Sequence, residues 1–344
     1  LWTGRSRNTK ELEPIKDVYG FYNIEKTFVI KKFFQIDSLV LFKVNEFLWA
    51  NLRNFVFSLN ICVHLMKYKN SKNVTLYSRD WCFLFVYLFF RKIGLVNNKV
   101  FYESHKFYKF LSKSLTKIDG VIVINNYLHK LHNDCGIKKL FLAHDGVNTD
   151  EYKFVSNYVF QPKKESFKVI YTGSLFLWKG VTTLVDSLKF LPENVDLIVI
   201  GGTGKYLQNF RQYVKSSGYE KRIQIVSHIP KIELLKFIEV ADALVLPNSA
   251  KDKMSLFTSP IKLFEYMASK RPIIASNIAS IAEVLSDQKN ALLFNPDDPE
   301  DLAFQITKTM ENDFSKMILQ AKQDCKKYTW DKRANDIAEV MNNE

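Results

Sequence analysis

The stretch "TSPIKLFEYMASKRPIIAS", Thr258 to Ser276, places a helical pattern directly before a short apolar run. Ser259 suits the N-cap of a helix and Pro260 suits the first helical position, so we expect a helix from about 260 to 269. The run "RPIIAS" at 271–276 has the length and composition of a buried strand. A helix followed at once by a buried strand is typical of βαβ units and indicates an α/β fold.

Lys262 occupies a position in this helix where a different residue type is expected. A capping box places Glu or Gln three residues after the cap, and a cation in the first turn faces the positive end of the helix dipole at a cost of roughly 0.3–1 kcal/mol. One explanation is a surface pair between Lys262 and Glu265 at i,i+3. The other is that Lys262 and the N–H groups of 260–262 bind an anion, while Glu265 accepts hydrogen bonds from ligand hydroxyls.

The alternation of strands and helices extends outward from this stretch over most of the chain. A first series predicts strands at 73–78, 99–104, 120–125 and 139–144, with helices near 81–93, 106–114 and 126–134. A second series predicts strands at 167–173, 196–202, 222–228, 241–247 and 271–276, with helices near 180–190, 204–217, 231–239 and 259–269. Continuously apolar strands separated by helices predict parallel sheets. We therefore expect two doubly wound, Rossmann-like domains with ligand sites at the carboxyl ends of their strands.

Domain boundaries follow from the segment 146–167, which is polar, lacks clear periodicity and is interpreted as a linker. We expect an N-terminal domain at 1–155, a C-terminal domain at 156–327, and a C-terminal helix within 328–344 that packs back on the N-terminal domain. The first 70 residues are Phe-rich and basic, and we expect them to be mostly helical after residue 36. Because the chain starts at Leu rather than Met, we also expect residues before Leu1 to be missing.

The charge balance favours an anionic partner. The chain has 49 Lys and Arg against 36 Asp and Glu, a net charge of +13, which suits a phosphorylated ligand, an acidic membrane surface or nucleic acid. The basic residues are dispersed and no RNA or DNA motif accompanies them, so we expect no nucleic-acid partner. The aromatic, basic stretch "LFKVNEFLWANLRNFVF" at 41–57 predicts peripheral contact with an anionic membrane; the alternative is that these aromatics pack as core.

Cysteine usage and hydropathy bear on the compartment. The four cysteines are far apart and form no CxxC pair, so we expect reduced thiols in a cytoplasmic protein. The longest apolar run, Trp81 to Phe90, is too short to span a bilayer. We therefore expect a cytoplasmic protein that contacts the inner face of the cell membrane peripherally.

Two glycine-containing turns in the second series are candidates for phosphate binding. "YTGSLFLWKG" places Gly173 just after a strand and Lys179 at the next helix start, which suits a diphosphate on backbone N–H groups; the alternative is a turn glycine and a solvated lysine. "IGGTGKY" is excluded as a P-loop because Tyr206 follows the Gly-Lys pair. It is excluded as a dinucleotide fingerprint because Leu207 stands where Gly or Ala is needed.

Several segments together resemble a known family. "YTGSLFLWKGVTTLVDSL", "IGGTG", "IPKIELLKFIEVADALVLPN", "SPIKLFEYMASKRPIIASNIASIAEVL" and "NALLFNPDDPEDLA" follow one another in this order. They resemble the donor half of a family 4 glycosyltransferase with the GT-B fold. "DGVNTDEY" (145–152) is similar to the segment that leaves the first domain, and "VFYESH" (100–105) to a first-domain strand that ends in Glu-x-His. The resemblance covers roughly 73 to 335. It also implies that a first strand of the N-terminal domain is among the residues missing before Leu1.

The resemblance implies a retaining, hexosyl-type transfer from a nucleotide-diphosphate sugar to a hydroxyl acceptor, in cell-envelope or lipid-linked glycan synthesis. It implies two domains that face each other across a cleft, with the N-terminal domain on the acceptor side and the C-terminal domain holding the donor. The expected catalytic residues are Lys179 and Lys262 on the diphosphate, Glu265 on the ribose hydroxyls and His105 near the acceptor or the sugar. The expected donor-binding residues are Gly173, Ser174, Ile229, Ser259, Pro260, Ile261 and Leu263. Leaving-group stabilisation by fixed positive charge needs no metal, so we expect neither a metal nor a cofactor besides the donor.

The sequence departs from the family pattern at two positions. Ser174 stands where many members have Arg, and Phe257 stands where the first Glu of a frequent Glu-x7-Glu motif is expected. The resemblance implies that the first Glu of this motif contacts hydroxyls of the sugar. We expect backbone N–H groups near 256–258 to make that contact in its place. Glu103, two residues before His105, lies on the same side of its strand and is a candidate for the same role in the cleft. These departures keep open a second hypothesis, a non-catalytic GT-B relative that acts as a binding or partner subunit. The sugar, the base and the acceptor also stay open.

Overall fold

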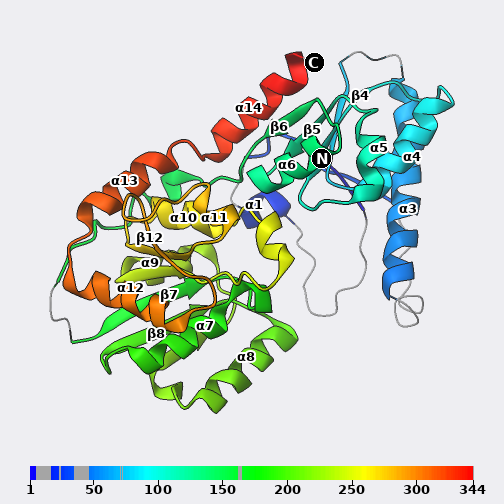
Figure 1. The fold of residues 1–344 in the computed structure, drawn as a ribbon. Helices are drawn as coiled ribbons and strands as arrows, with labels where there is room; N and C mark the ends of the chain where they lie inside the picture. The colour runs from blue at the N-terminus through cyan, green and yellow to red at the C-terminus, as the bar shows by residue number, and fades with distance from the viewer. Residues whose placement is uncertain are drawn as a thin grey trace. The chain divides into compact units, whose positions relative to one another are not determined.

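The computed structural model describes residues 1–4, 17–22, 25–34, 46–69, 71, 73–161 and 165–343 (Figure 1). The expected helical structure at 36–45 and the first five residues of the predicted membrane segment lie outside these ranges. The chain divides into two compact units, of which unit 1 comprises Leu1–Ser104, Tyr108–Ile122 and Cys135–Lys139. Unit 2 comprises His105–Phe107, Val123–Asp134 and Leu140–Glu344. The boundaries expected at 155/156 and 327/328 stay predictions.

Unit 2 is built on a six-stranded parallel sheet. Its strands are β7 (Phe167–Thr172), β8 (Val195–Ile200), β9 (Ile223–Val226), β10 (Ala243–Leu246), β11 (Ile273–Ser276) and β12 (Leu292–Phe294), in the order β12-β11-β10-β7-β8-β9. The direction of the strand order reverses between β7 and β10. In open parallel sheets, ligands bind outside the carboxyl ends of the strands at such a reversal. The sheet confirms the predicted α/β, Rossmann-like class.

Helices cover both faces of this sheet, and alternate residues of each strand point to opposite faces. In β7, Val169 and Tyr171 belong to the core on one face, with α7 (Val181–Asp186), α8 (Gly204–Ser217) and α12 (Pro299–Glu311). Ile170 belongs to the core on the other face, with α9 (Lys231–Glu239), α10 (Ile261–Ala268), α11 (Ala279–Ala282) and α13 (Ser315–Cys325). This sheet is therefore doubly wound, as predicted (Figure 1).

The segment interpreted as a linker contributes to the core of unit 2. Val147, Tyr152 and Val155 are at most 4% exposed and belong to the core that contains α10. A 3₁₀ turn, η3, runs over Thr149–Tyr152. The last helix, α14 (Trp330–Asn343), is joined to the start of this segment, because the Trp330 N–H donates to the Val147 carbonyl at 3.4 Å. The polar composition of the segment predicted a linker, but three of its side chains are buried in the core.

The first series of predicted strands forms a four-stranded sheet with the order β3-β4-β5-β6. The strands are β3 (Thr75–Ser78), β4 (Lys99–Ser104), β5 (Gly120–Val123) and β6 (Leu140–Leu142). The principal helices are α3 (Glu46–Leu65), α4 (Trp81–Lys92), α5 (Ser112–Leu115) and α6 (Asn126–Asp134). The helix predicted at 106–114 was wrong in extent, because a 3₁₀ turn at Lys109–Leu111 precedes the short α5. A separate parallel pair consists of β1 (Trp2–Gly4) and β2 (Lys31–Phe33), and α1 spans Val18–Tyr22.

Within the ranges given above, no helix has both the length and the apolar character needed to cross a bilayer.

Candidate functional site

A pocket of about 340 Å³ lies at the carboxyl ends of β7 and β8 and at the start of α10. It brings together five residues that the sequence predicted for the donor site, namely Gly173, Ser174, Ile229, Lys262 and Glu265. Its other lining residues are Thr172, Leu175, Phe176, Ile200, Gly201, Gly202, Thr203, Tyr206, His228 and Leu234. The pocket therefore lies outside the carboxyl ends of the strands, where parallel sheets bind ligands, and it begins at β7, one of the two strands at the reversal.

Two glycines allow the ends of β7 and β8 to approach each other and α10. Gly173 has φ +128°, and a Cβ there would lie 2.2 Å from the Lys262 Nζ. Gly201 has φ +122°, and a Cβ there would lie 2.3 Å from the Gly173 carbonyl oxygen. Residues with a side chain rarely adopt such dihedrals. Glycine at 173 therefore gives the Lys262 side chain the space it occupies at the end of β7.

The first turns of α10 are fixed to the same strand. The Tyr266 hydroxyl, which is fully buried, accepts a hydrogen bond from the Thr172 N–H at 2.9 Å. Lys262, one turn before Tyr266, and Glu265, the residue directly before it, both line the pocket. Because a helix places i and i+4 on one face, Tyr266 sets the direction in which Lys262 projects.

The predicted helix start was wrong by one residue. The helix begins at Ile261 with Pro260 at the N-cap position, and no side chain caps it. The Ser259 hydroxyl instead accepts a hydrogen bond from the Asp145 N–H at 3.0 Å. This N–H is buried and needs an acceptor, so a contact far along the chain uses the hydroxyl that was expected to cap α10.

Lys262 does not form the surface pair that the sequence left open. Its Nζ donates to the Tyr171 hydroxyl at 2.9 Å and lies 4.1 Å from the centroid of that ring. Burial of the ammonium and then the charge of Lys179 lower the pKa of Lys262 well below its usual value, while Glu265 acts in the opposite direction. An anion in the pocket would favour the charged form of this lysine.

Lys179 does not line the pocket. It ends the 3₁₀ turn η4 (Leu177–Lys179), is 7% exposed, and places its ammonium 3.8 Å from the centroid of the Trp178 ring. Burial lowers its pKa to about 8. Gly180 follows with φ +65°, where a Cβ would lie 1.8 Å from the Pro247 carbonyl oxygen. Two desolvated lysines close enough to lower a neighbour's pKa mark this region as one that would accept a multivalent anion.

Comparison with known proteins agrees with this geometry. The model of the family described as "Glycosyl transferases group 1" matches residues 157–331, which is just over half of the chain. The chain belongs to the glycosyl transferases group 1 family. This assignment confirms the predicted family, and the finer family 4 resemblance is consistent with it.

The relatives with curated descriptions share little sequence identity with this glycosyltransferase. An uncharacterized glycosyltransferase of Methanocaldococcus jannaschii is 23% identical over 233 residues, which cover 67% of this chain and 61% of the relative. A D-inositol 3-phosphate glycosyltransferase of Xylanimonas cellulosilytica is 23% identical over 177 residues, which cover 50% of this chain and 41% of the relative. The matched region thus spans about half of these relatives' own length.

Solved structures support the fold. The Anabaena protein HepE in complex with UDP and glucose superposes with a TM-score of 0.70 at 15% identity, covering 95% of this chain and 88% of that one. The lipopolysaccharide outer core galactosyltransferase WaaB in its apo form gives a TM-score of 0.68 at 16% identity, covering 92% and 85%. The predicted GT-B fold is confirmed; how its two domains face each other stays a prediction.

Several residues that the sequence predicted for the site do not line the pocket. Leu263 is fully buried in the core, and Ile261 is 47% exposed. Glu103 is buried in an ion pair with Arg79 at 2.7 Å, which gives it a structural contact. The remaining predicted residues outside the lining are Lys179, Ser259, Pro260 and His105. Their proposed roles stay predictions.

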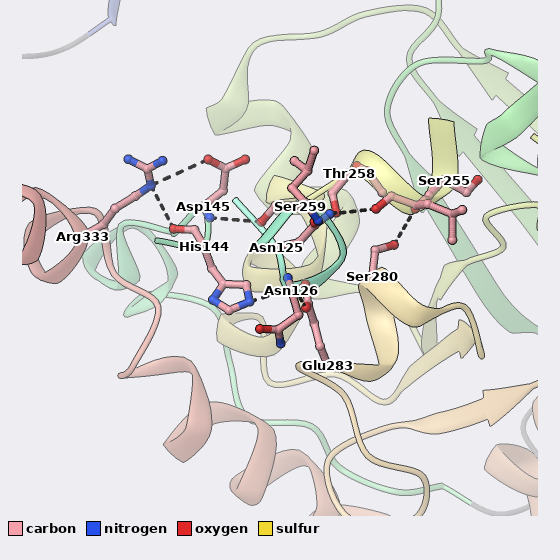
Figure 2. A network of polar contacts seen from close by, with 12 residues as sticks. Asn125, Asn126, His144, Asp145, Ser255, Thr258, Ser259, Ser280, Glu283 and Arg333 are labelled. Atoms are coloured by element: carbon pink, nitrogen blue, oxygen red, sulfur yellow. Dashed lines mark hydrogen bonds and ion pairs between the residues drawn. The ribbon is translucent and has the colours of Figure 1, made fainter. Parts of the chain in front are cut away.

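A network of polar contacts that the sequence did not reveal holds the loop before α10 (Figure 2). The Asn125 side-chain amide donates to the Leu256 and Thr258 carbonyls at 2.9 and 3.0 Å. The Ser280 hydroxyl donates to the Ser255 carbonyl at 2.6 Å. Partners more than a hundred residues apart leave no periodic signal, so Asn125 could not be predicted.

The position of the departure at Phe257 lies within this anchored loop. The Phe257 ring packs against Tyr127, with centroids 5.6 Å apart. Phenylalanine here therefore makes an aromatic contact with α6, where the family pattern would place a carboxylate.

Proposed function

We propose that this chain is a retaining glycosyltransferase that moves a sugar from a nucleotide-diphosphate sugar to a hydroxyl acceptor. The observation that carries the proposal is that Lys262 and Glu265 both line one pocket at the start of α10. The lysine supplies positive charge where helix N–H groups also favour an anion. The carboxylate, one turn deeper, can accept hydrogen bonds from ribose hydroxyls.

The chemical role of the cations is to stabilise the departing nucleoside diphosphate. Negative charge develops on the leaving group as the glycosidic bond breaks, and fixed positive groups stabilise it more in the transition state than in the ground state. Lys262 would contact the diphosphate directly, and Lys179, which does not line the pocket, would add positive charge nearby. The proposal includes no metal and no cofactor besides the donor. Retention of configuration and hexosyl transfer rest on the family 4 resemblance.

Donor and acceptor classes come from the resemblance and from the structural neighbours. HepE was crystallised with UDP and glucose, and WaaB is a lipopolysaccharide outer core galactosyltransferase. We propose a UDP-sugar as the first donor to test and a cell-envelope or lipid-linked glycan as the acceptor. His105 and the N-terminal domain would serve the acceptor side.

An assay with UDP-, GDP- and ADP-hexoses tests the proposal. Release of nucleoside diphosphate, with and without lipid-linked or polysaccharide acceptors, should be detected with at least one donor. The alternative, a non-catalytic GT-B relative, is favoured by Ser174 and by the packing of Phe257. Saturable donor binding without any turnover across the acceptor panel would support that alternative and contradict the proposed transfer.

The geometry around Gly173 yields a prediction about the missing arginine. Ser174 lines the same pocket as Lys262, whose ammonium lies against Gly173. If Lys262 replaces the absent cation, Ser174→Arg should recover at least about 10-fold of the transfer lost in Lys262→Ala, because neighbouring groups on one ligand are strongly non-additive. In the wild-type background the same change should have little effect or reduce transfer. Transfer rates of the two single variants and the double variant measure the interaction. Strict additivity would show that the two residues serve separate sites.

We further propose that the chain is cytoplasmic and contacts the inner face of the cell membrane through unit 1. Apolar side chains of α3 and α4 are exposed, including Leu48 at 64%, Phe55 at 48% and Phe89 at 60%. Between the two helices lies a groove of about 480 Å³, lined by Asn51, Phe55, Leu59, Trp81, Cys82, Phe85, Val86, Phe89 and Phe90. The exposure of Leu48 and Phe55 supports the membrane interpretation of the aromatic segment at 41–57 over the core interpretation for these two residues.

The basic charge of the segment that forms α3 and α4 favours an anionic lipid surface as the occupant of this face. From Glu46 to Lys92 the sequence contains the basic residues Arg53, Lys67, Lys69, Lys72, Arg79, Arg91 and Lys92, and the acidic residues Glu46 and Asp80. An amphipathic face with an excess of basic side chains binds anionic headgroups reversibly, and salt weakens the binding.

Sedimentation with vesicles tests this membrane contact. We expect the protein to sediment with vesicles of phosphatidylcholine and phosphatidylglycerol at low salt, and with phosphatidylcholine alone much less. Phe89→Ser should reduce the bound fraction because it removes exposed apolar area from the face. Phe304→Ser, which changes a 57% exposed side chain on α12, is the matched control. Equal partition with and without anionic vesicles would rule the contact out.

A further inference from the structure

A lysine outside the pocket lining holds the carboxylate that the proposed function assigns to ribose. Lys231, the first residue of α9, forms an ion pair with the Glu265 Oε1. The same ammonium lies 3.2 Å from the Glu151 Oε2 of η3 and 5.2 Å from the centroid of the Tyr152 ring. The Glu265 side chain is 13% exposed, against 38% for Lys231 and 40% for Glu151. Of the two carboxylates that contact Lys231, the less exposed one, Glu265, is therefore the one that lines the pocket.

This ion pair restricts what Glu265 can do. A glutamate side chain on a helix surface has several rotamers, and ordering it costs free energy. A charge-assisted hydrogen bond to one oxygen fixes the carboxylate and leaves the other oxygen to accept from a ligand. Burial acts to lower the pKa of Lys231, yet Glu265 and Glu151 raise it on balance. The ammonium of Lys231 therefore stays charged at ordinary pH.

The packing around Lys231 favours this single position of its ammonium. Tyr152 is 1% exposed and belongs to the core beneath α10. The aromatic ring supports the ammonium on one side by a cation–π contact, while Glu151 engages it from the more exposed side. A lysine with three contacts from two other segments is held more firmly than an exposed surface pair.

We propose that Lys231 is a positioning residue that directs Glu265 toward the ribose hydroxyls of the donor. The inference rests on the proposed function, because it takes the ligand of Glu265 to be a nucleoside diphosphate. Lys231 itself contacts no ligand in this account. Its removal should weaken recognition of the ribose hydroxyls specifically and leave recognition of the diphosphate by Lys262 largely in place.

Binding of nucleoside diphosphates with and without ribose hydroxyls tests the inference. Calorimetric titration would compare UDP, GDP and ADP with their 2′,3′-dideoxy counterparts in the wild-type protein and in Lys231→Met. We expect the wild type to prefer the hydroxylated form of the base it binds by about 10-fold or more, as for a hydrogen bond to a charged group. In Lys231→Met this ratio should fall to near one, with affinity for the dideoxy form nearly unchanged.

Two further variants separate positioning from a structural role. Lys231→Arg keeps the cation and should restore most of the ratio. Glu151→Gln removes only the outer carboxylate and should leave the ratio near the wild-type value. Melting temperatures of all variants report folding independently of the ratio. An unchanged ratio in Lys231→Met, or equal loss of affinity for both forms, would overturn the inference. A wild type that binds none of the three nucleotides would instead overturn the proposed function, and the inference with it.

Discussion

Replacing Lys262 with alanine is expected to lower sugar transfer by about 10²–10³-fold, the usual effect of removing one fixed donor from a developing anion. The Lys262 ammonium lines the pocket, lies against Gly173, and is held on the Tyr171 hydroxyl at 2.9 Å. In the proposed reaction it would face the leaving diphosphate, so its loss should appear mainly in kcat. Steady-state rates with the donor varied measure the effect.

The fold should survive this substitution. The pKa of Lys262 is lowered first by burial and then by the charge of Lys179, which means that the folded protein disfavours the charged form of this side chain. Removing it relieves that penalty while opening a space next to an existing pocket. Lys236→Ala, on the exposed side of α9, is the matched control. Transfer by Lys262→Ala at the rate of this control would refute the assignment of the diphosphate site.

Replacing Glu265 with alanine should lower kcat/KM for the donor by about 10²-fold, because hydrogen bonds to a charged group contribute about 1.5–3 kcal/mol each. Glu265 lines the pocket one turn after Lys262, and its Oε1 is held by Lys231. The alanine variant would leave the ribose hydroxyls without their carboxylate acceptor and would leave Lys231 with Glu151 alone.

The control for this variant is Glu233→Ala, which removes an exposed carboxylate from the first turn of α9. Both proteins should unfold at similar temperatures, since α10 is anchored by Tyr266 on Thr172 rather than by Glu265. If Glu265→Ala turned over the donor as well as Glu233→Ala, the carboxylate would have no part in donor recognition.

Local patterns predicted the sheet of unit 2 well, for a physical reason. Strands such as β7 and β8 are apolar on both faces, which only a parallel sheet between two helical layers provides. The last strand, β12, is three residues long and was not predicted as an element. Its pattern is too short to distinguish from a loop.

A site residue could be predicted from the sequence where its type is unfavourable at its position in the secondary structure. Lys262 in the first turn of a helix was such a conflict, and the structure places it in the pocket. The contact of Ser259 with Asp145 and the pair of Glu265 with Lys231 could not be predicted. Both depend on segments that meet only in the folded chain, and tertiary contacts override local capping preferences.

The most direct test of the central claim is the melting temperature of the protein in the presence of UDP-, GDP- and ADP-sugars. A ligand that binds only the folded state at 100 times its Kd adds about 2.7 kcal/mol of stability. We predict that at least one donor raises the melting temperature of the wild type and that the increase largely disappears in Lys262→Ala. An increase of the same size in both proteins, or none with any donor, would contradict the claim that Lys262 and the start of α10 bind a nucleotide-diphosphate sugar.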